Sequence, residues 1–497
     1  MASRYEEFVT EVQSISDIAY SSAVLSWDQE TYMPRGGAAH RARQLATLAG
    51  IVHEKSTNPK LGSLLDELIA DTSLNEVQRI NVKYVHKQYK RALKYPREFV
   101  MNMSRTVSES VSAWQQAKPA GDFAAFAPHL EKLITLKREE CELLGYTAHP
   151  YDALLDEFEP GLTTAEVEKL FADVRTELVP FVKQIAQQPE NSDALILQHF
   201  PKDKQFAMSE TLLRMIGFDF ETGRQDISLH PFTINFGASD VRVTTKIDEH
   251  NLSDMFTGTI HEGGHALYEQ GLQAGEYGLP SGEYVSLGIH ESQSRLWENN
   301  VGRSEAFSKA VLPKLREAFP EQFVNATATD FFKALNVVRP SLVRIMADEL
   351  TYHFHIMVRF ETEKALIEGS LNVHDVPEFW NGRIREYLGL EVPNAGAGCL
   401  QDIHWSHGSF GYFPTYSIGS FYAAQFYAAA ENQIADLEAK IERGELHELL
   451  NWLRENIHHH GKRYTASELC ERVTGEPLSF RYFMEYARKK YRKLYAI

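Results

Sequence analysis

The chain has 497 residues, with 51 Lys and Arg against 68 Asp and Glu, so its formal net charge is −17. Hydrophobic residues make up 43% and charged residues 24% of the sequence, which is typical of a globular protein with a large core. The acidic balance argues against binding to nucleic acid or to an anionic membrane surface, because both need a basic footprint. A soluble enzyme or a large helical interaction scaffold remains.

The first residues of the chain are polar and acidic and contain no apolar signal-peptide core. The most apolar late segment, residues 421–430, is much shorter than the roughly 20 residues that span a bilayer. Three cysteines without a CxxC pair are too few for a disulfide framework or a thiolate metal site. We therefore expect a cytoplasmic protein that does not span a membrane.

Apolar residues recur at three- and four-residue spacing along most of the chain, which predicts an all-α, mainly helical fold. No Ser/Gly-rich linker divides the sequence, so we expect a single catalytic unit over residues 1–497. The clearest helical periodicity lies in residues 165–183, 205–216, 253–270, 341–368 and 433–455.

Residues 230–245 break the helical pattern. Two short runs of alternating apolar and polar residues flank the turn Gly237-Ala238-Ser239-Asp240, which is typical of a β-hairpin. A two-stranded sheet is only marginally stable alone, so we expect it to pack on helices beside the motif that follows. Two interpretations stay open, namely a purely structural hairpin or an edge strand that pairs with an extended peptide.

The stretch His261–His265 reads His-Glu-Gly-Gly-His and fits the H-E-x-x-H pattern. It lies in a predicted helix with Ser253 or Asp254 as the cap and Gly271 as the stop. Two histidines four residues apart share a helix face and can bind one metal ion, while Glu262 holds a metal-bound water. Each of the two glycines costs about 1 kcal/mol in a helix, which suggests that something approaches this helix closely.

A hydrolytic zinc site needs a third protein ligand and one open position. The metzincin extension is absent, because Tyr268 and Gly271 stand where its Gly and third His belong. Glu291 follows on a helix-like stretch and is our candidate ligand, with Arg295 one turn later to steady the carboxylate. The alternative is that Glu291 lies on a solvated helix face.

Residues 401–416 are rich in Gly, His, Trp and Tyr and show little helical periodicity, which favours a loop at a functional site. An oxyanion that develops during peptide hydrolysis needs a hydrogen-bond donor besides the metal. His404, Tyr412 and Tyr416 are the candidates, and the sequence does not choose among them.

These motifs together resemble the carboxypeptidase Taq family of zinc metallocarboxypeptidases, over nearly the whole chain. Six short segments carry the resemblance in order, and a seventh near the N-terminus, residues 26–34, is also similar to the family. The six are His230-Pro231-Phe232, residues 240–244 (Asp-Val-Arg-Val-Thr), His261–His265, residues 290–294 (His-Glu-Ser-Gln-Ser), residues 344–348 (Arg-Ile-Met-Ala-Asp) and residues 398–405.

The resemblance implies an almost wholly helical protein with a small hairpin or sheet beside the metal helix. It also implies a deep cleft and an overall shape similar to thimet oligopeptidase and angiotensin-converting enzymes. Residues 1–150 would form a helical part that covers the cleft, and residues 151–497 would carry the zinc site. Members are usually cytoplasmic homodimers that release single C-terminal residues from peptides with broad preference.

The family's site residues carry over to this sequence by motif. Zinc, for which cobalt can substitute, would bind His261, His265 and Glu291, with Glu262 as the base. A carboxypeptidase also needs a cation for the free carboxylate of its substrate, and arginine binds carboxylates bidentately. Arg344 is the first candidate, because family members use an arginine there. Its alternative role is an ion pair with Asp348.

Arg242 is the second candidate for the carboxylate, and a structural salt bridge on the hairpin is about equally favoured.

Two other functions compete with the metallocarboxypeptidase. A zinc oligopeptidase that cuts inside short peptides would use the same metal chemistry without the carboxylate clamp. A helical scaffold with an incidental H-E-x-x-H predicts no metal and no activity that depends on Glu262.

Overall fold

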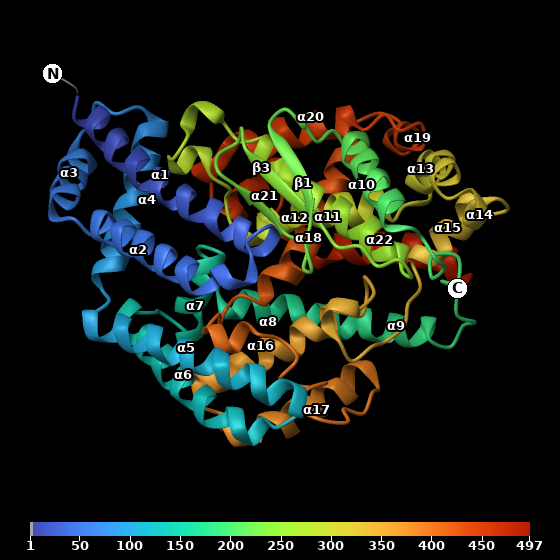
Figure 1. Cartoon of the computed structure of the whole chain (residues 1–497), viewed down its shortest axis with the longest axis horizontal. Coiled ribbons are helices and arrows are strands. Elements are labelled where there is room, and N and C mark those ends of the chain that lie inside the picture. Colours follow the sequence, from blue (N-terminus) through green and yellow to red (C-terminus); the bar gives the residue numbers. More distant parts are fainter. Residues whose placement is uncertain (1–2) are drawn as a thin grey trace. The chain divides into compact units, whose positions relative to one another are not determined.

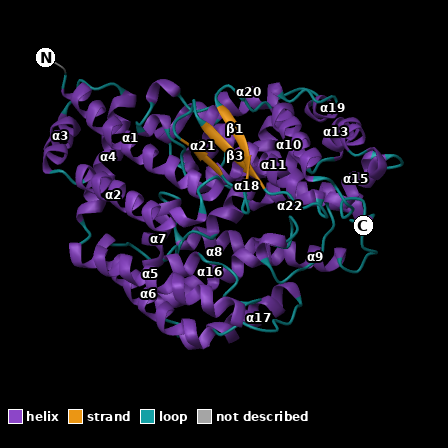
Figure 2. Ribbon diagram, in the orientation of Figure 1, coloured by secondary structure: helices purple, strands orange, loops and turns teal. Residues whose placement is uncertain are grey.

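The computed structural model describes residues 3–497, which form a mainly helical protein with one small three-stranded sheet (Figures 1 and 2). The predicted fold class is therefore confirmed. The chain divides into two compact units, and each is built from three separate segments. Unit 1 comprises Met1–Ala92, Ser192–Leu335 and Tyr422–Leu478. Unit 2 comprises Leu93–Asn191, Asn336–Phe421 and Ser479–Ile497.

Unit 1 contains the sheet and the metal-binding motif. Helices of its first segment pack apolar residues into a core around Phe8 and Leu65, to which Leu279 of the second segment also contributes. The helices of this unit are α1 (Arg4–Thr31), α2 (Ala38–Ser56), α3 (Pro59–Ala70), α4 (Glu76–Leu93), α10 (Lys202–Ile216), α11 (Leu252–Gln270), α12 (Leu287–Arg295), α13 (Glu305–Ala318), α14 (Pro320–Phe323), α15 (Ala328–Leu335), α19 (Leu437–Glu442), α20 (His447–Asn456) and α21 (Ala466–Thr474).

The sheet contains β1 (Gly223–Ile227), β2 (Thr233–Asn235) and β3 (Val241–Thr245) in the order β1-β3-β2. β2 and β3 are antiparallel, with Ile234 opposite Arg242, so the predicted hairpin is confirmed. β1 pairs in parallel with β3 and was not predicted, because its sequence Gly-Arg-Gln-Asp-Ile lacks apolar alternation. Helix α11 packs against β2 and β3, which places the sheet directly beside the metal-binding motif.

Unit 2 is built around α16 (Tyr352–Glu368), a helix that is buried on nearly all sides and packs against α6, α7 and α17. The other helices of this unit are α5 (Arg97–Ala120), α6 (Phe123–Leu144), α7 (Pro150–Phe158), α8 (Thr164–Asp173), α9 (Val179–Ile185), α17 (Val376–Leu388) and α22 (Phe480–Tyr495). Helix α18 (Pro414–Gln433) begins in unit 2 and ends in unit 1.

Two predicted helices differ from the observed ones. The segment 341–368 becomes helical only at Tyr352, and Arg344–Met346 is a separate 3-10 turn. The carboxylate of Asp348 accepts bonds from the backbone N–H groups of Leu350 and Thr351, both 3.0 Å away, and thereby closes a turn before the helix. The segment 433–455 is interrupted between α18 and α19 and again before α20, where Gly444 has a φ of +77°.

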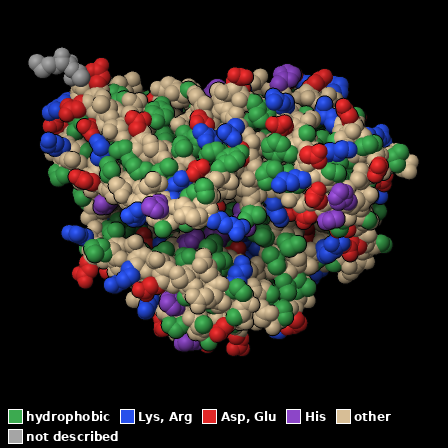
Figure 3. Space-filling model, viewed as in Figure 1, with side chains coloured by type: hydrophobic (Ala, Val, Ile, Leu, Met, Phe, Trp, Pro, Cys, Tyr) green, Lys and Arg blue, Asp and Glu red, His purple; other side chains and the backbone are tan. Residues whose placement is uncertain are grey.

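Among residues 3–497, no helix combines the length and the apolar character that a membrane crossing requires. On the face drawn in Figure 3, acidic and basic side chains are interspersed. The predicted roles of residues 1–150 as a cover and of residues 151–497 as the carrier of the zinc site stay predictions.

Candidate active site

Helix α11 presents the two histidines of the motif on one face. It begins after Asn251, whose side chain accepts a bond from the backbone N–H of Ser253 at 3.0 Å, so the cap is Asn251 rather than the predicted Ser253 or Asp254. The helix ends at Gly271 as predicted. The rings of His261 and His265 lie one helical turn apart, with their centroids at 4.9 Å.

Helix α12 brings the third candidate ligand to the histidines. A Cβ atom on Gly264 would stand 2.7 Å from both the backbone oxygen of Gln293 and the Cα atom of Ser294. A Cβ atom on Gly263 would likewise collide with the side chains of Leu213 and Ile216 of α10. The two glycines are therefore needed because two neighbouring helices approach α11, and this proximity places α12 against the metal-binding face.

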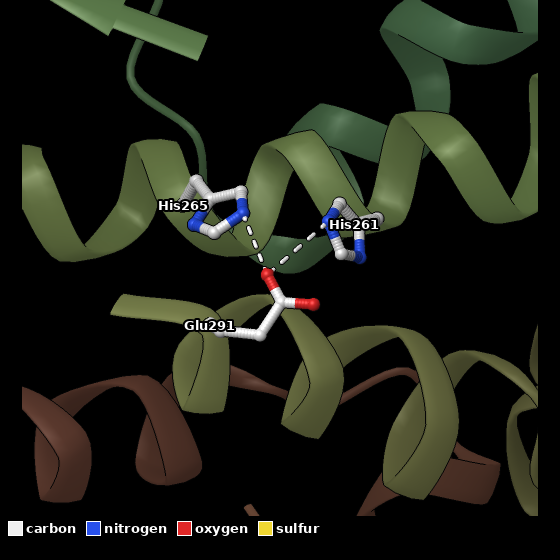
Figure 4. Close-up of side chains that lie close together, drawn as sticks. All are labelled: His261, His265 and Glu291. Carbon is white, nitrogen blue, oxygen red and sulfur yellow. Dashed lines mark ion pairs between the residues drawn. The ribbon is translucent and has the colours of Figure 1, made fainter. Parts of the chain in front are cut away.

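His261, His265 and Glu291 form a compact group of donor atoms (Figure 4). Glu291 Oε2 lies 3.4 Å from His265 Nε2 and 3.8 Å from His261 Nε2. A tetrahedral zinc site with bonds of about 2.1 Å separates its ligand atoms by about 3.4 Å. Two imidazoles and one carboxylate at these separations fit a hydrolytic zinc site with one position left for water or substrate.

Glu298 fixes the orientation of His261. It lies on the π-helical turn Leu296–Gly302 that continues α12, and its Oε2 is 2.9 Å from His261 Nδ1. The guanidinium of Arg295 lies 3.0 Å from Glu298 and 2.7 Å from Glu291, so it holds both carboxylates. A hydrogen bond at Nδ1 leaves His261 Nε2 available as the ligand atom.

A second chain of contacts supports His265. Its Nδ1 contacts the ring of His290, and His290 Nε2 lies 2.7 Å from Glu269 Oε1. His290 immediately precedes the ligand Glu291 in the sequence. Two adjacent residues of α12 therefore supply one metal ligand and support the other ligand, His265. This pairing again directs the Nε2 atom of the histidine toward the metal position.

The protonation states of two of the three residues, Glu291 and His265, suit metal binding. Burial opposes ionisation of Glu291, but Arg295 and then His261 outweigh it and lower the pKa of this carboxyl. Burial, with the neighbouring His290, lowers the pKa of His265 to about 3. At neutral pH Glu291 is therefore an anion and His265 is neutral, as metal ligands must be.

Glu262 is buried beside the donor group but does not belong to it. The Thr233 hydroxyl at the start of β2 lies 2.9 Å from Glu262 Oε2. Burial raises the pKa of Glu262 above its usual range. The hairpin therefore touches the candidate base directly.

Arg242 forms the structural salt bridge that was one of its two interpretations. Its Nε and Nη2 atoms donate to the two oxygens of Asp240 at 3.0 and 2.9 Å. The guanidinium also lies 4.4 Å from the centroid of the Trp27 ring on α1. A role in substrate binding stays a prediction.

In unit 2, Arg344 binds Asp402 rather than Asp348. Its Nε and Nη2 atoms lie 3.1 and 3.0 Å from Asp402 Oδ1, and its Nη1 donates to the hydroxyl of Tyr352 at 3.1 Å. Asp348 is engaged in the turn before α16 instead. The buried Arg359 contacts the other oxygen of Asp402, so one carboxylate separates two guanidinium groups.

The aromatic candidates of unit 2 lie together, and Tyr416 among them contacts Arg344. The ring centroids of His404 and Tyr416 lie 5.3 and 5.2 Å from that of Tyr412, and the Arg344 guanidinium lies 5.0 Å from the Tyr416 ring. Burial lowers the pKa of His404 to about 4, so its ring is neutral at physiological pH. The structure brings these residues together, and their catalytic roles stay predictions.

Several residues that hold the candidates in place were not predicted from the sequence. Glu298 follows Glu291 by seven residues, two helical turns on the same face, and this spacing is the signal that could have revealed it. Thr233 and Glu269 gave no such signal, because their partners lie far away in sequence. Asp402 lies in the motif of residues 398–405, but the motif alone does not indicate its role.

A helical fold with this donor group is typical of metallopeptidases, and comparison with known proteins gives the family. The model of the carboxypeptidase Taq (M32) metallopeptidase family matches residues 7–491. The chain therefore belongs to the carboxypeptidase Taq (M32) metallopeptidases, and it is a metallocarboxypeptidase.

Individual relatives are similar over their whole length. Thermostable carboxypeptidase 1 of Thermus thermophilus is 40% identical over 506 residues, which cover 99% of each chain. Carboxypeptidase 1 of Bacillus subtilis is 38% identical over 494 residues, again 99% of each chain. The crystal structure of the M32 carboxypeptidase from Deinococcus radiodurans superposes with a TM-score of 0.98 at 40% identity, covering 100% of both chains.

Proposed function

We propose that the chain is a zinc-dependent metallocarboxypeptidase that releases single C-terminal amino acids from peptides with broad preference. The donor group of His261, His265 and Glu291 supports zinc as the metal, because the distances between its ligand atoms suit a zinc site. Imidazole and carboxylate ligands also accept cobalt, so Co²⁺ is expected to substitute. Arg344 and Glu262 supply the two further functions that a carboxypeptidase needs.

His261, His265 and Glu291 would hold the zinc ion, which would acidify a bound water molecule and polarise the carbonyl group of the scissile bond. Glu262 accepts a proton from the attacking water and passes it to the leaving amine. Burial raises the pKa of Glu262 towards the working pH, which favours both halves of this transfer. The Thr233 hydroxyl holds the carboxylate in place for it.

Arg344 binds the free carboxylate of the substrate, and Arg242 is the second candidate for this role. Recognition of a terminal carboxylate rather than of a side chain supports broad preference. The neutral His404 and the hydroxyls of Tyr412 and Tyr416 are the candidate donors to the oxyanion. Their clustering with Arg344 supports a shared substrate-binding role in unit 2.

We also propose that the protein acts in the cytoplasm as a homodimer. Its three cysteines are buried and free, which suits a reducing compartment. The dimer and a deep cleft covered by residues 1–150, in a shape similar to thimet oligopeptidase, rest on the family resemblance alone. Light scattering of the purified protein measures the oligomeric state.

Mass spectrometry of one peptide, digested with a free and with an amidated C-terminus, tests the function. We expect a ladder of single C-terminal losses that chelation and amidation both abolish. Glu262→Gln should keep the metal and lose most turnover, because the ligands survive and the base does not. Cleavage inside the peptide that does not depend on amidation would instead favour a zinc oligopeptidase. If the peptide is not cleaved with zinc or cobalt supplied, the helical scaffold becomes the favoured interpretation.

A further inference from the structure

Glu363 is a completely buried carboxylate that accepts three hydrogen bonds and that the proposed mechanism does not use. It lies on α16. Its Oε2 accepts from the hydroxyl of Tyr151 at 2.6 Å and from the backbone N–H of Gly411 at 2.9 Å. Its Oε1 accepts from the indole N–H of Trp405 at 2.8 Å.

Two of these donors belong to the same loop, and the candidate oxyanion donors lie next to them. His404 immediately precedes Trp405, and Tyr412 immediately follows Gly411. Because one carboxylate binds Trp405 and Gly411 together, it closes the loop 405–411 at both ends. The ring centroids of His404 and Tyr412 lie 5.3 Å apart at the closed end of the loop.

The backbone at Gly411 is shaped for this contact. Its φ is +91°, and a Cβ atom there would stand 2.7 Å from the carbonyl carbon and oxygen of Leu154 on α7. Only glycine therefore lets the loop lie against α7 while its N–H reaches Glu363. At the other end of the loop, the Trp405 ring packs edge-on against Trp380 at 5.7 Å.

We propose that Glu363 is a positioning residue of the peptidase reaction, which closes the loop 405–411 and thereby sets His404 and Tyr412 in place for the substrate. It acts as a carboxylate, because two of its three partners, an indole N–H and a backbone N–H, can only donate. The inference rests on the proposed role of His404 and Tyr412 in catalysis.

The charge on Glu363 is sensitive to pH near neutrality. Burial raises the pKa of this carboxyl to about 7, against the opposing effect of its three donors and of Lys137. Lys137 on α6 lies 2.5 Å from Glu140 and is largely neutralised by it. Arg359 on α16 is engaged by Asp402, and His404 is already neutral in this range. Protonation of Glu363 weakens the bonds to Trp405 and Gly411 and loosens the loop as the pH falls.

Glu363→Gln tests the proposal, because the amide has the same shape but presents an N–H group to one of the donors. We expect kcat/KM for a peptide with a free C-terminus to fall about 10- to 100-fold, the effect of a small misplacement of catalytic groups. Zinc content should not change. The part of the decline in wild-type activity that is centred at about pH 7 should be absent from the variant, while the decline that protonation of Glu262 causes should remain.

Glu361→Gln is the matched control. Glu361 lies on the same helix but binds Tyr387 at 2.8 Å, outside the loop. The Glu361→Gln variant should keep both the activity and the pH profile of the wild type. A Glu363→Gln enzyme with wild-type kcat/KM and an unchanged pH profile would overturn the proposal.

The indole N–H of Trp405 gives a readout that does not depend on activity. In ¹⁵N-tryptophan-labelled protein, with the signal assigned through Trp405→Phe, its chemical shift should titrate around neutral pH in wild type and not in Glu363→Gln. An indole signal that ignores pH overturns this inference while the peptidase function stands. A titrating indole in a protein without carboxypeptidase activity overturns the proposed function instead.

Tyr151→Phe keeps the test possible if Glu363→Gln does not fold. Loss of the Tyr151 hydroxyl removes a donor that lowers the pKa of Glu363. The titration of the Trp405 indole should therefore move to higher pH, and the decline of activity with it. An unmoved titration would overturn the assignment of Glu363.

Discussion

The backbone of Gly264 lies so close to α12 that a Cβ atom on Gly264 would stand 2.7 Å from the Cα atom of Ser294. Gly264 has no side chain, and the nearest atoms of α12 are backbone atoms of Gln293 and Ser294, so the two helices touch through their backbones. Glu291 lies one turn before Ser294. The separation between the two histidines and the carboxylate is therefore set by the missing side chain of Gly264.

We expect Gly264→Ala to destabilise the protein and to weaken metal binding. An alanine gains about 1 kcal/mol of helix propensity, but the collision with backbone atoms costs on the order of 1–3 kcal/mol and pushes α12 away. Gly258→Ala is the control, because a Cβ atom there meets nothing nearer than Pro231 at 3.9 Å. Urea unfolding and zinc titration measure both variants. Gly264→Ala should lose stability and zinc affinity, whereas Gly258→Ala should keep its zinc affinity and have unchanged or slightly higher stability.

Glu298→Gln should lower zinc affinity about 10- to 100-fold, the usual effect of losing the partner of a metal-binding histidine. The amide presents no charge to the Nδ1–H of His261 and releases Arg295 and Arg303 from one of their partners. Competition with a chelator of known affinity measures the change. Glu442→Gln removes an exposed carboxylate paired with Lys309 and should leave the affinity as it was.

Arg344→Ala should reduce kcat/KM for peptides with a free C-terminus about 10- to 100-fold, since a hydrogen bond to a charged group contributes about 1.5–3 kcal/mol. The kcat/KM for the amidated peptide should change much less. The ratio of kcat/KM between the free and the amidated peptide should therefore become smaller. Arg385→Ala, which removes an exposed arginine paired with Glu391, is the control. An equal loss on both peptides would move the carboxylate-binding role to another residue.

The raised pKa of Glu363 also makes a prediction about stability. In the folded protein the pKa is about 7, above the 4.5 of an exposed glutamate. Unfolding between these two values releases a proton, so the contribution of Glu363 to stability is present at low pH and is lost as the pH rises through about 7. The free energy of unfolding of wild type minus that of Glu363→Gln should therefore be larger at about pH 5 than at about pH 8. A difference that grows with pH would contradict the assignment.

The parts of the fold that follow from local sequence were predictable. Helical periodicity predicted the metal helix and its end at Gly271, and the spacing of His261 and His265 predicted a shared face. Glu291 could be proposed because it lies on the next helix and in a motif. The distance of Glu291 from the histidines could not be predicted from the sequence, because that distance depends on the packing of α11 against α12.

The errors and omissions have physical causes. Periodicity alone placed Arg344 in a helix, but the side chain of Asp348 closes a turn that delays α16 until Tyr352. The same periodicity cannot reveal that Arg344 pairs with Asp402, which lies 58 residues away in the chain. Glu363 has the appearance of an ordinary helical glutamate in the sequence, and only its complete burial marks it out.

The composition of the two units has a consequence for how the protein is made. Each unit draws on three segments, so the polypeptide passes from one unit to the other five times. Unit 1 is not complete until Leu478 has been synthesised, and unit 2 not until the final helix has been added. Domains commonly fold one after another as a ribosome releases them. We therefore expect the nascent form of this chain to expose unfinished cores for most of translation and to depend on chaperones more than a tandem two-domain protein of equal size.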